Sequence, residues 1–384
     1  MGSAKKKKLK FLSFAEQYND RKTSPRCPHF GTCGGCLFQD YEYDAQLCIK
    51  LDYLQSIFNG LCTLESIVPS QPFCYRNRMD FVTAFGKAGL RRSGSYRHVV
   101  DLETCEIMQE KSNILFKKLR PALLEIEGYN YLNHSGFLRY AVLRQGKFTG
   151  TTMVNFVIAH HEYEQRLLPA IETIQKDVDS ISILFNDGLA DMSFGEVHEI
   201  IKGGHIEESF DGIRFRITPN SFFQSNSEIA LAMYRRVRDE LQGEKVLDLY
   251  SGVGSISLFV AGKAAHVTGI ELVEEAVDNA RINMELNGIT NVEFHCFDAR
   301  DYLKNCTEQY DAVILDPPRA GTHPKVMQHL KNLAPETIIY ISCNPSSFKN
   351  DLQELDNYAM TSFEAFDMFP QTPHIETLAV LKRK

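Results

Sequence analysis

Short apolar runs alternate with amphipathic stretches along the chain from about residue 211 onward. Residues 227–241, 255–261 and 273–287 have the three- and four-residue apolar spacing of helices. The apolar runs have the length and β-branched content of buried strands, and they cover residues 246–250, 267–271, 292–297, 312–316, 338–342, 360–367 and 374–382. Alternating strands and helices predict a doubly wound, mostly parallel α/β sheet that binds ligands at the carboxyl ends of its strands.

A different pattern fills residues 65–210, where short strand-like runs follow one another with turn signals such as Gly86-Lys87-Ala88-Gly89 between them. The runs cover residues 79–85, 137–144, 152–158, 181–185 and 197–201. We therefore predict a middle α+β domain with an antiparallel sheet. Upstream, residues 27–64 contain a cysteine-rich segment and a helix predicted from 41 to 58, and residues 1–26 are predicted to be a flexible basic arm. The expected division is thus 1–26, 27–64, 65–210 and 211–384.

Composition describes an ordered protein, with 43% hydrophobic and 11% aromatic residues among 384. Residues 1–150 carry a net charge of +8 and residues 151–384 one of -15, which favours docking of a polyanion on the first part. No apolar stretch approaches the roughly 20 residues of a membrane span. The lysine run near the start has no apolar core after it, so it is not typical of a signal peptide. We therefore expect no membrane contact. Ten cysteines without a secretion signal indicate a reducing, cytoplasmic location for the protein.

The loop after the first C-terminal strand suggests a nucleoside site. Its pattern, Asp248-x-x-x-Gly252-x-Gly254, lacks both the third glycine of the dinucleotide fingerprint and the lysine of a P-loop. Glu271, at the end of the next strand, can accept hydrogen bonds from both ribose hydroxyls. Asp298, after the third strand, can accept one from an adenine amino group. The alternative is an ordinary α/β turn whose acidic residues cap helices.

A thiol and two carboxylates are expected at this same edge of the sheet. Cys343 follows one apolar run, Asp316 ends another, and Glu376 lies in the last strand. A thiolate at Cys343 is suited to attack on a ring carbon, with Arg319 nearby to lower its pKa. Burial would raise the pKa of Glu376 and suit it to proton abstraction. His374 is the rival base, and its alternative role is that of a hydrogen-bonded structural histidine.

Cys27, Cys33 and Cys36 lie close together in the sequence with glycines between the last two. Such glycines let a loop fold back so that its amides point at a metal or at cluster sulfides. Four cysteines hold zinc as readily as an iron–sulfur cluster, so spacing alone leaves both open. Further cysteines that are candidates for a fourth ligand are Cys48, Cys62 and Cys74.

Basic and aromatic residues are interleaved early in the middle segment. The basic residues are Arg76, Arg78, Arg91, Arg92 and Arg97, and the aromatic ones are Tyr75, Phe81, Phe85 and Tyr96. Cations for phosphates and rings for unstacked bases indicate single-stranded or loop RNA. The alternative is a solvated face over an ordinary core.

Several motifs occur in an order that resembles the RNA uracil-5 methyltransferase family. They are Phe222-Phe223-Gln224-Ser225-Asn226, the glycine loop at 248–254, Asp316-Pro317-Pro318-Arg319-x-Gly321, Ser342-Cys343-Asn344-Pro345 and Pro373-His374-Ile375-Glu376. The N-terminal cysteines resemble the [4Fe–4S] ligands of its cluster-bearing bacterial and archaeal members. The resemblance extends from Cys27 to Glu376. It implies a class I, S-adenosylmethionine-dependent methyltransferase with a seven-stranded sheet, preceded by the α+β domain and a small iron–sulfur region.

The resemblance also implies a role for each matched residue. Cys343 would be the nucleophile that adds to C6 of uracil, and Glu376 the base that removes the C5 proton. The implied cofactor-binding residues are Gln224, Tyr250, Gly252, Ser255, Glu271, Asp298 and Asp316, and the implied cluster ligands are Cys27, Cys33, Cys36 and Cys105. Tyr250 stands where Phe is common, and Ser255 where Asn is common. We expect no accessory β-barrel of the kind some members carry, since 26 residues precede Cys27.

The expected activity is methylation of uridine C5 in RNA through a covalent cysteine–C6 adduct, with ribosomal RNA favoured and transfer RNA as the alternative. The target base must leave its stack to reach the site. We expect a structural or RNA-orienting cluster, because methyl transfer needs no electron, and a monomer without an obligate protein partner. Three other functions stay open. A noncatalytic iron–sulfur RNA-binding protein would not need Cys343 and Glu376, an iron–sulfur redox protein would need a partner site, and a cytosine-5 RNA methyltransferase would differ in the base it accepts.

Overall fold

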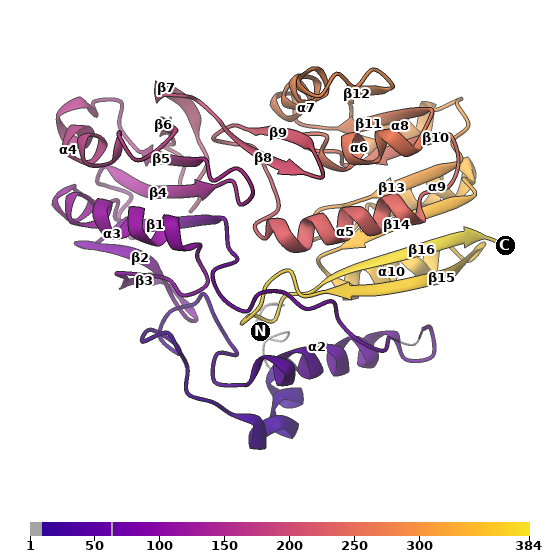
Figure 1. Ribbon diagram of the computed structural model, residues 1–384, viewed down its shortest axis with the longest axis horizontal. Helices are drawn as coiled ribbons and strands as arrows, with labels where there is room; N and C mark the ends of the chain where they lie inside the picture. Colours follow the sequence, from indigo (N-terminus) through magenta and orange to yellow (C-terminus); the bar gives the residue numbers. More distant parts are fainter. Residues whose placement is uncertain (1–9, 63) are drawn as a thin grey trace.

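Two seven-stranded sheets lie side by side in the computed structural model of the protein, which describes residues 10–62 and 64–384 (Figure 1). A two-stranded hairpin, β8 (Ile206–Phe210) and β9 (Ile213–Ile217), lies between them. The helix α2 (Tyr43–Phe58) crosses below the C-terminal sheet in the view of Figure 1. Within the described ranges, no helix has the length and apolar character needed to span a membrane.

The C-terminal sheet has the strand order β12-β11-β10-β13-β14-β16-β15. Its first five strands are parallel, and β16 is inserted antiparallel between β14 and β15. The strands are β10 (Lys245–Leu249), β11 (His266–Glu271), β12 (Val292–Cys296), β13 (Ala312–Leu315), β14 (Thr337–Ser342), β15 (Tyr358–Phe366) and β16 (Glu376–Arg383). The predicted doubly wound, mostly parallel sheet is confirmed.

Helices cover both faces of this sheet, because alternate strand residues point to opposite sides. Val313 and Leu315 of β13 belong to the core under α2 and the helices α8 (Ala299–Asn305), α9 (Pro324–Leu333) and α10 (Pro345–Glu354). Ala312 and Ile314 belong to the opposite core, under α5 (Ser227–Glu240), α6 (Ser255–Val260) and α7 (Glu274–Leu286). Burial on both faces explains the continuous apolar runs in the sequence and leaves the carboxyl edge as the place for ligands.

The N-terminal sheet has the order β3-β2-β1-β4-β5-β6-β7 and is antiparallel except between β5 and β6. Its strands are β1 (Arg78–Ala84), β2 (Lys87–Arg92), β3 (Ser95–Asp101), β4 (Leu138–Gln145), β5 (Thr152–Ile158), β6 (Ser180–Phe185) and β7 (Glu196–Lys202). The helices α3 (Glu110–Glu125) and α4 (Glu164–Ile174) share one core with it. The predicted α+β region is therefore present, and the parallel pair is joined through α4.

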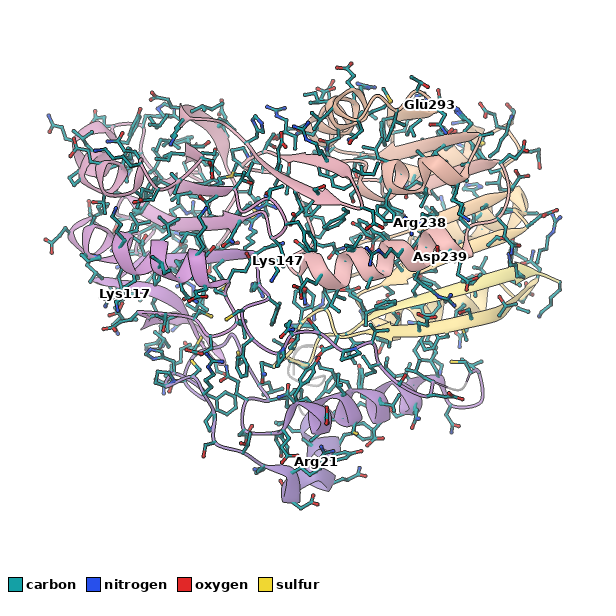
Figure 2. The ribbon with its side chains drawn as sticks, viewed as in Figure 1. Arg21, Lys117, Lys147, Arg238, Asp239 and Glu293 are labelled. Atoms are coloured by element: carbon teal, nitrogen blue, oxygen red, sulfur yellow. The ribbon has the colours of Figure 1, made fainter. Side chains whose placement is uncertain are left out.

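The β8–β9 hairpin links the two sheets. Its apolar residues pack in the core of α5, α6 and α7, although a boundary was expected just after residue 210. Glu208 is buried, and its carboxylate accepts hydrogen bonds from the backbone of Lys147 and Phe148 and from Ser227 Oγ. Lys147 Nζ also lies 3.0 Å from Glu228 Oε1 at the start of α5, and Figure 2 shows Lys147 between the sheets. These contacts connect the N-terminal sheet to the hairpin and to α5 of the C-terminal part.

The expected flexible arm is wrong for the part of it that the structure describes. Residues 10–15 are helical, and a 3-10 helix, η1 (Glu16–Arg21), follows. Phe11 is buried and stacks on Tyr53 of α2 with ring centroids 4.0 Å apart. An apolar residue in this arm therefore anchors it to α2, while the lysine run at 5–8 lies outside the described residues.

Candidate active site

Cys343 and Glu376 lie opposite one another at the ends of two neighbouring strands. Ser342, the last residue of β14, pairs with Thr377 of β16, and Thr377 Oγ1 donates a hydrogen bond to the carbonyl of Ser342 at 3.2 Å. Continuing this antiparallel register by one residue sets Cys343 opposite Glu376. Glu376 is 5% exposed and Cys343 is half-buried. The predicted thiol and carboxylate therefore meet at the carboxyl edge of the sheet.

Asn344 ties the loop that carries Cys343 to the loop after β13. Its Nδ2 donates hydrogen bonds to the carbonyl of Arg319 at 3.1 Å and to Ser347 Oγ at 2.7 Å. Arg319 Nη2 in turn lies 3.4 Å from His374 Nδ1. The arginine and the rival base thus contact each other beside the candidate nucleophile.

The turn after β10 has the backbone of a close-approach loop. Tyr250, Gly252 and Gly254 have φ values of +66°, +56° and +77°. A Cβ on Gly254 would lie 2.6 Å from the ring of Phe294, so only glycine fits there. Tyr250 holds a left-handed conformation without being glycine, which is uncommon for a bulky residue. Burial raises the pKa of its phenol to about 12, so it remains a hydrogen-bond donor at neutral pH.

Backbone amides fix the carboxylate of Glu271 at the end of β11. Its Oε2 accepts a hydrogen bond from Gly252 N at 3.0 Å. Its Oε1 accepts bonds from Leu272 N and Val273 N at 2.8 and 2.9 Å. An oriented carboxylate next to a glycine turn suits the recognition of ribose hydroxyls, as expected from the sequence.

Asp248 and Asp316 form an acidic pair deeper in the site. Burial raises the pKa of Asp248 to about 7, and the carboxylate of Asp316 adds to this rise. Burial also raises the pKa of Asp316 to about 6. Ser257 Oγ donates to Asp248 Oδ2 at 2.5 Å, but Asp248 Oδ1 is buried without a partner among the described residues. The sequence assigned no role to Asp248, and its signal was an acidic residue inside an otherwise apolar strand.

Three of the predicted cofactor residues also have structural partners. Asp298 caps α8, because its side chain accepts hydrogen bonds from the backbone of Arg300 and Asp301. The helix-capping alternative is therefore correct for this residue, whatever else it contacts. Ser255 Oγ lies 2.9 Å from the hydroxyl of Tyr234. The backbone carbonyl of Gln224 accepts a bond from Asn77 Nδ2, which positions the segment that carries Gln224.

One cavity of about 2400 Å³ contains both sets of residues. Its lining includes the candidate catalytic pair, Cys343 and Glu376. It also includes all seven predicted cofactor residues, namely Gln224, Tyr250, Gly252, Ser255, Glu271, Asp298 and Asp316. Pockets for small ligands measure about 300–1,000 Å³, so this cavity has room for a nucleoside cofactor and for part of a larger substrate.

Known proteins are similar to this chain in sequence and in fold. A family model described as tRNA (Uracil-5-)-methyltransferase matches residues 205–384. The tRNA (uracil(54)-C(5))-methyltransferase of Pyrococcus furiosus is 38% identical over 99% of this chain and 91% of that protein. The chain belongs to the tRNA (uracil-5-)-methyltransferase family. The expected enzyme class, an RNA uracil-5 methyltransferase, is therefore confirmed.

Relatives of this methyltransferase extend to bacteria and include a solved structure. An uncharacterized RNA methyltransferase of Thermotoga maritima is 35% identical over 97% of this chain and 87% of that protein. The crystal structure of the Pyrococcus abyssi tRNA (uracil-54, C5)-methyltransferase in complex with S-adenosyl-L-homocysteine matches with a TM-score of 0.83 and 37% identity. It covers 91% of this chain and 84% of the Pyrococcus chain. The fold of the methyltransferase is thus shared over nearly its whole length.

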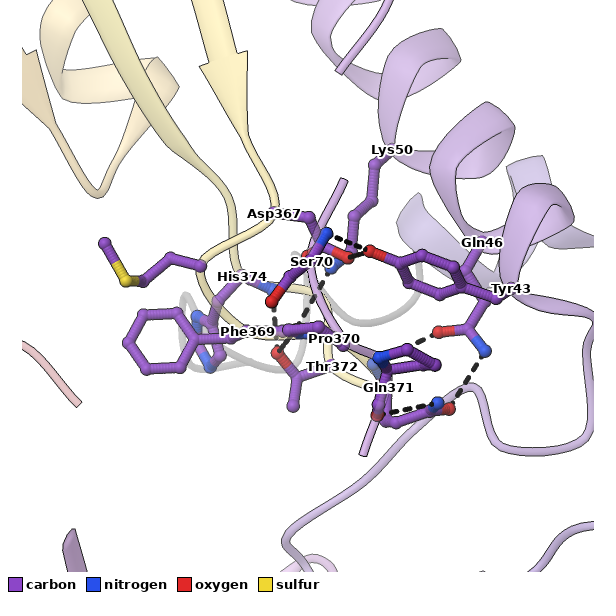
Figure 3. A network of polar contacts seen from close by, with 12 residues as sticks. Tyr43, Gln46, Lys50, Ser70, Asp367, Phe369, Pro370, Gln371, Thr372 and His374 are labelled. Carbon is purple, nitrogen blue, oxygen red and sulfur yellow. Dashed lines mark hydrogen bonds and ion pairs between the residues drawn. The ribbon is translucent and has the colours of Figure 1, made fainter. Parts of the chain in front are cut away.

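A polar network anchors the loop that precedes Glu376 in the methyltransferase (Figure 3). Lys50 Nζ of α2 binds Asp367 Oδ1 at 2.5 Å and the carbonyl of Phe369 at 3.1 Å. Gln46 and Gln371 exchange two hydrogen bonds through their side chains and the backbone of Gln371. The cysteine-rich segment joins this network, because the amides just after Cys36 donate to the Gln371 carbonyl. The N-terminal region therefore positions the approach to the candidate base.

The four predicted cluster cysteines of the methyltransferase gather in one region. Burial raises the pKa of Cys36 to about 12, and the thiols of Cys105, Cys33 and Cys27 add to this rise. Cys48, Cys62 and Cys74 are not among the groups that change the pKa of Cys36. Within residues 10–62 and 64–384, however, no group of three or more His, Cys, Asp or Glu is arranged to hold a metal ion. The thiols are thus close enough to interact without forming a closed metal site.

The predicted basic and aromatic face of the methyltransferase is only partly available to RNA. Tyr75 and Phe81 are core residues, with Phe81 stacked on Phe116 at 3.6 Å, so their expected role in base stacking is wrong. Arg91 Nη2 binds both oxygens of Asp191. Among the predicted arginines Arg92 is exposed to solvent, and so is Arg97. Part of the charge on this face thus serves internal ion pairs, and part of it is exposed.

Proposed function

We propose that this enzyme transfers a methyl group from S-adenosylmethionine to C5 of a uridine in transfer RNA. The observation that carries the proposal is the position of Cys343 opposite Glu376, where both line the cavity that also contains the predicted cofactor residues. Thiol addition and proton abstraction are the two steps that C5 methylation of a pyrimidine needs, and here the two groups stand on neighbouring strands.

The residues that line the pocket fit the proposed cofactor. S-adenosylmethionine supplies an electrophilic methyl group on a sulfonium. Glu271 would accept hydrogen bonds from the ribose hydroxyls. Asp298 would accept one from the adenine amino group, through the lone pairs that its bonds to the start of α8 leave free. The partnerless Asp248 Oδ1 would accept the ammonium of the amino-acid part, because a buried carboxylate oxygen needs a donor. Gln224, Tyr250, Gly252, Ser255 and Asp316 would complete the contact surface.

The candidate catalytic pair would act in sequence on the target base. The Cys343 thiolate would add to C6 of uracil and make C5 enolate-like. C5 would then take the methyl group from the sulfonium, as the bond between the methyl carbon and sulfur breaks and S-adenosylhomocysteine is left. Glu376 then removes the proton from C5, and the electron pair of that C–H bond restores the C5–C6 double bond. The bond between C6 and Cys343 Sγ breaks in the same elimination, and the thiolate is regenerated.

Transfer RNA replaces ribosomal RNA as the proposed substrate. The sequence favoured ribosomal RNA, but the named archaeal relatives are tRNA (uracil(54)-C(5))-methyltransferases at 36–38% identity. These matches cover nearly all of both chains, which supports a common substrate. We therefore propose uridine 54 of transfer RNA as the target.

We also propose that Cys27, Cys33, Cys36 and Cys105 hold a [4Fe–4S] cluster. This ligand set is supported by the packing of Cys36 against the core that contains Cys105, and by the thiols of Cys105, Cys33 and Cys27, which add to the rise in the pKa of Cys36 caused mainly by burial. Four thiolates are the usual ligands of such a cluster. Its expected role is structural, because the loop that follows Cys36 binds the segment leading to Glu376.

The direct test is a methylation assay with defined RNA. Purified enzyme with S-adenosylmethionine should convert one uridine of a transfer RNA transcript to 5-methyluridine, detected by mass spectrometry of the digested product. Replacing uridine 54 by cytidine is the matched control and should abolish incorporation. Methylation of ribosomal fragments alone, or of cytidine, would refute the proposed substrate.

A further inference from the structure

The loop of residues 186–195 exposes large apolar side chains. It joins β6 to β7, and within it Leu189 is 71%, Met192 48% and Phe194 44% exposed. Surface loops are usually polar, and exposed apolar groups that gather in one place tend to mark interaction sites. Packing within the chain therefore does not explain why these three apolar side chains are exposed.

Arg139 holds the first half of this loop rigidly from below. Its side chain is fully buried, and its guanidinium donates hydrogen bonds to the carbonyls of Asn186, Gly188 and Ala190 at 2.6–2.7 Å. Asn186 Nδ2 closes the loop by donating to the carbonyl of Phe194. Backbone polar groups thus turn inward while the apolar side chains remain outside.

Polar side chains hold the second half of the loop. Asp191 accepts hydrogen bonds from Arg91 and from the hydroxyl of Tyr140. Ser193 Oγ donates to Asp80 Oδ2 at 2.6 Å. An exposed ring on so well-anchored a loop is pre-organised, which reduces the entropy lost when it binds a ligand.

The loop borders the cavity that contains Cys343. Met192 and Phe194 line this cavity, whereas Leu189 of the same loop is not among its lining residues. Asn220 Nδ2 donates to the carbonyl of Gly195 at 2.9 Å, which ties the loop to the segment that leads to Gln224. The cavity is larger than a nucleoside cofactor needs, and the remaining part of it reaches Met192 and Phe194.

Cations surround the same surface. The guanidinium of Arg78, which is paired with Asp80, lies 5.0 Å from the centre of the Phe194 ring, and Arg76 and Arg92 line the cavity. Rings and apolar side chains next to arginines are the chemistry that binds unstacked bases together with their phosphates. A flipped target uridine also leaves its neighbours without a stacking partner.

We propose that Met192 and Phe194 form a stacking shelf for an RNA nucleobase adjacent to the target uridine. The shelf rests on the proposed RNA-methylating function and extends it by naming where the flanking strand binds. Phe194 provides the aromatic face, Met192 adapts to the shape of the base, and Arg78 lies near the ring. The shelf selects unpaired or opened RNA rather than an intact duplex.

The test compares Phe194→Ala and Met192→Ala with Leu189→Ala, an exposed apolar residue of the same loop that does not line the cavity. The probe is a transfer RNA fragment with 2-aminopurine next to the target uridine. Phe194→Ala should weaken binding by about tenfold, within the range expected for loss of one base–aromatic stack. The salt dependence of binding should stay unchanged, because no phosphate contact is lost. Phe194→Tyr should restore both affinity and quenching of 2-aminopurine, and Leu189→Ala should behave as the wild type.

Equal affinity and quenching in Phe194→Ala and the wild type would overturn the shelf. So would an equal loss in Leu189→Ala, or a loss of self-association or protein binding in place of RNA binding. The wild type is assayed for 5-methyluridine in parallel. If it binds the probe through Phe194 but methylates no RNA, the shelf stands and the proposed function fails.

Discussion

Lys50 Nζ lies 2.5 Å from Asp367 Oδ1, and neither side chain is exposed to solvent. The pair joins α2 to the end of β15, a sequence separation of 317 residues. Burial lowers the pKa of Lys50, and the nearby Asp367 opposes this effect by favouring the charged ammonium. Tyr43 adds a hydrogen bond from its hydroxyl to Asp367 Oδ2 at 2.9 Å. The loop that leads to Glu376 is therefore held through a buried charge pair.

Removing one partner of this pair should destabilise the protein strongly. Lys50→Met leaves the Asp367 carboxylate buried without its counter-ion, and such losses cost about 3–5 kcal/mol. The free energy of unfolding, measured with urea, should fall by this amount. Lys331→Met is the control, because Lys331 pairs with Asp356 at the surface, where an ion pair adds little to stability. Equal effects of the two variants would contradict the importance of the buried pair.

The chemical step can be tested by trapping the covalent adduct. With 5-fluorouridine RNA and S-adenosylmethionine, the wild type should form a complex that survives denaturation, because fluorine cannot leave C5 as a cation. Cys343→Ala should give neither adduct nor product. Glu376→Gln should methylate ordinary RNA but release it slowly, so that covalent complex accumulates on denaturing gels.

His374→Ala is the control for the identity of the base. If Glu376→Gln releases product normally and His374→Ala accumulates the adduct, the base is His374, which lies 3.4 Å from Arg319 Nη2. Full turnover by Cys343→Ala would rule out the thiol as nucleophile.

Cofactor binding should depend on pH through Asp248. Its pKa is raised to about 7 by burial, so the carboxyl is protonated below this value in the free enzyme. An ammonium group favours the carboxylate, so binding at lower pH must release a proton. Affinity for S-adenosylhomocysteine should therefore rise by up to about tenfold per pH unit below about pH 7 and level off above it. Calorimetry should show this slope in the wild type and a smaller one in Asp248→Asn, where Asp316 still titrates near pH 6. Asp278→Asn, an exposed control on α7, should keep the full slope.

The sequence predicted the C-terminal sheet closely, because strands buried on both faces are apolar throughout. β13 is an example, since all four of its residues are buried. The meeting of Cys343 and Glu376 at one edge followed from the order of strands. The strands β2 and β3 were not predicted separately, because Arg and Ser residues interrupt their apolar pattern.

The contacts that position the site were harder to predict. Lys50 lies at the same helical spacing as Tyr53, Leu54 and Ile57 on the buried face of α2. This spacing indicated burial, but lysine is usually exposed. Its partner, Asp367, lies too far along the chain for any local pattern to connect the two. The loop at 186–195 falls between the predicted strands at 181–185 and 197–201, and the exposure of its apolar residues to the cavity could not be read from the sequence.

Docking by charge should depend on exposed arginines rather than on all of them. Arg92→Glu should weaken transfer RNA binding and reduce the slope of log affinity against log salt by about one, as for one lost phosphate contact. Arg91→Glu should instead lower the melting temperature, since Arg91 binds Asp191 within the protein. Filter binding at several salt concentrations and thermal melting separate the two effects. An unchanged salt slope in Arg92→Glu would exclude it from the docking surface.

The cysteine set makes a prediction about metal content. Enzyme purified without oxygen should contain about four irons per chain, as a cluster held by four thiolates requires. Cys105→Ser should lose iron and its visible absorbance, because Cys105 acts on Cys36 together with Cys33 and Cys27. Cys74→Ser is the matched control, since Cys74 is exposed and its Sγ is 3.8 Å from the carbonyl of Glu106. Iron should stay bound in that variant. Stoichiometric zinc in place of iron, or loss of iron in Cys74→Ser with retention in Cys105→Ser, would show that the proposed ligand set is wrong.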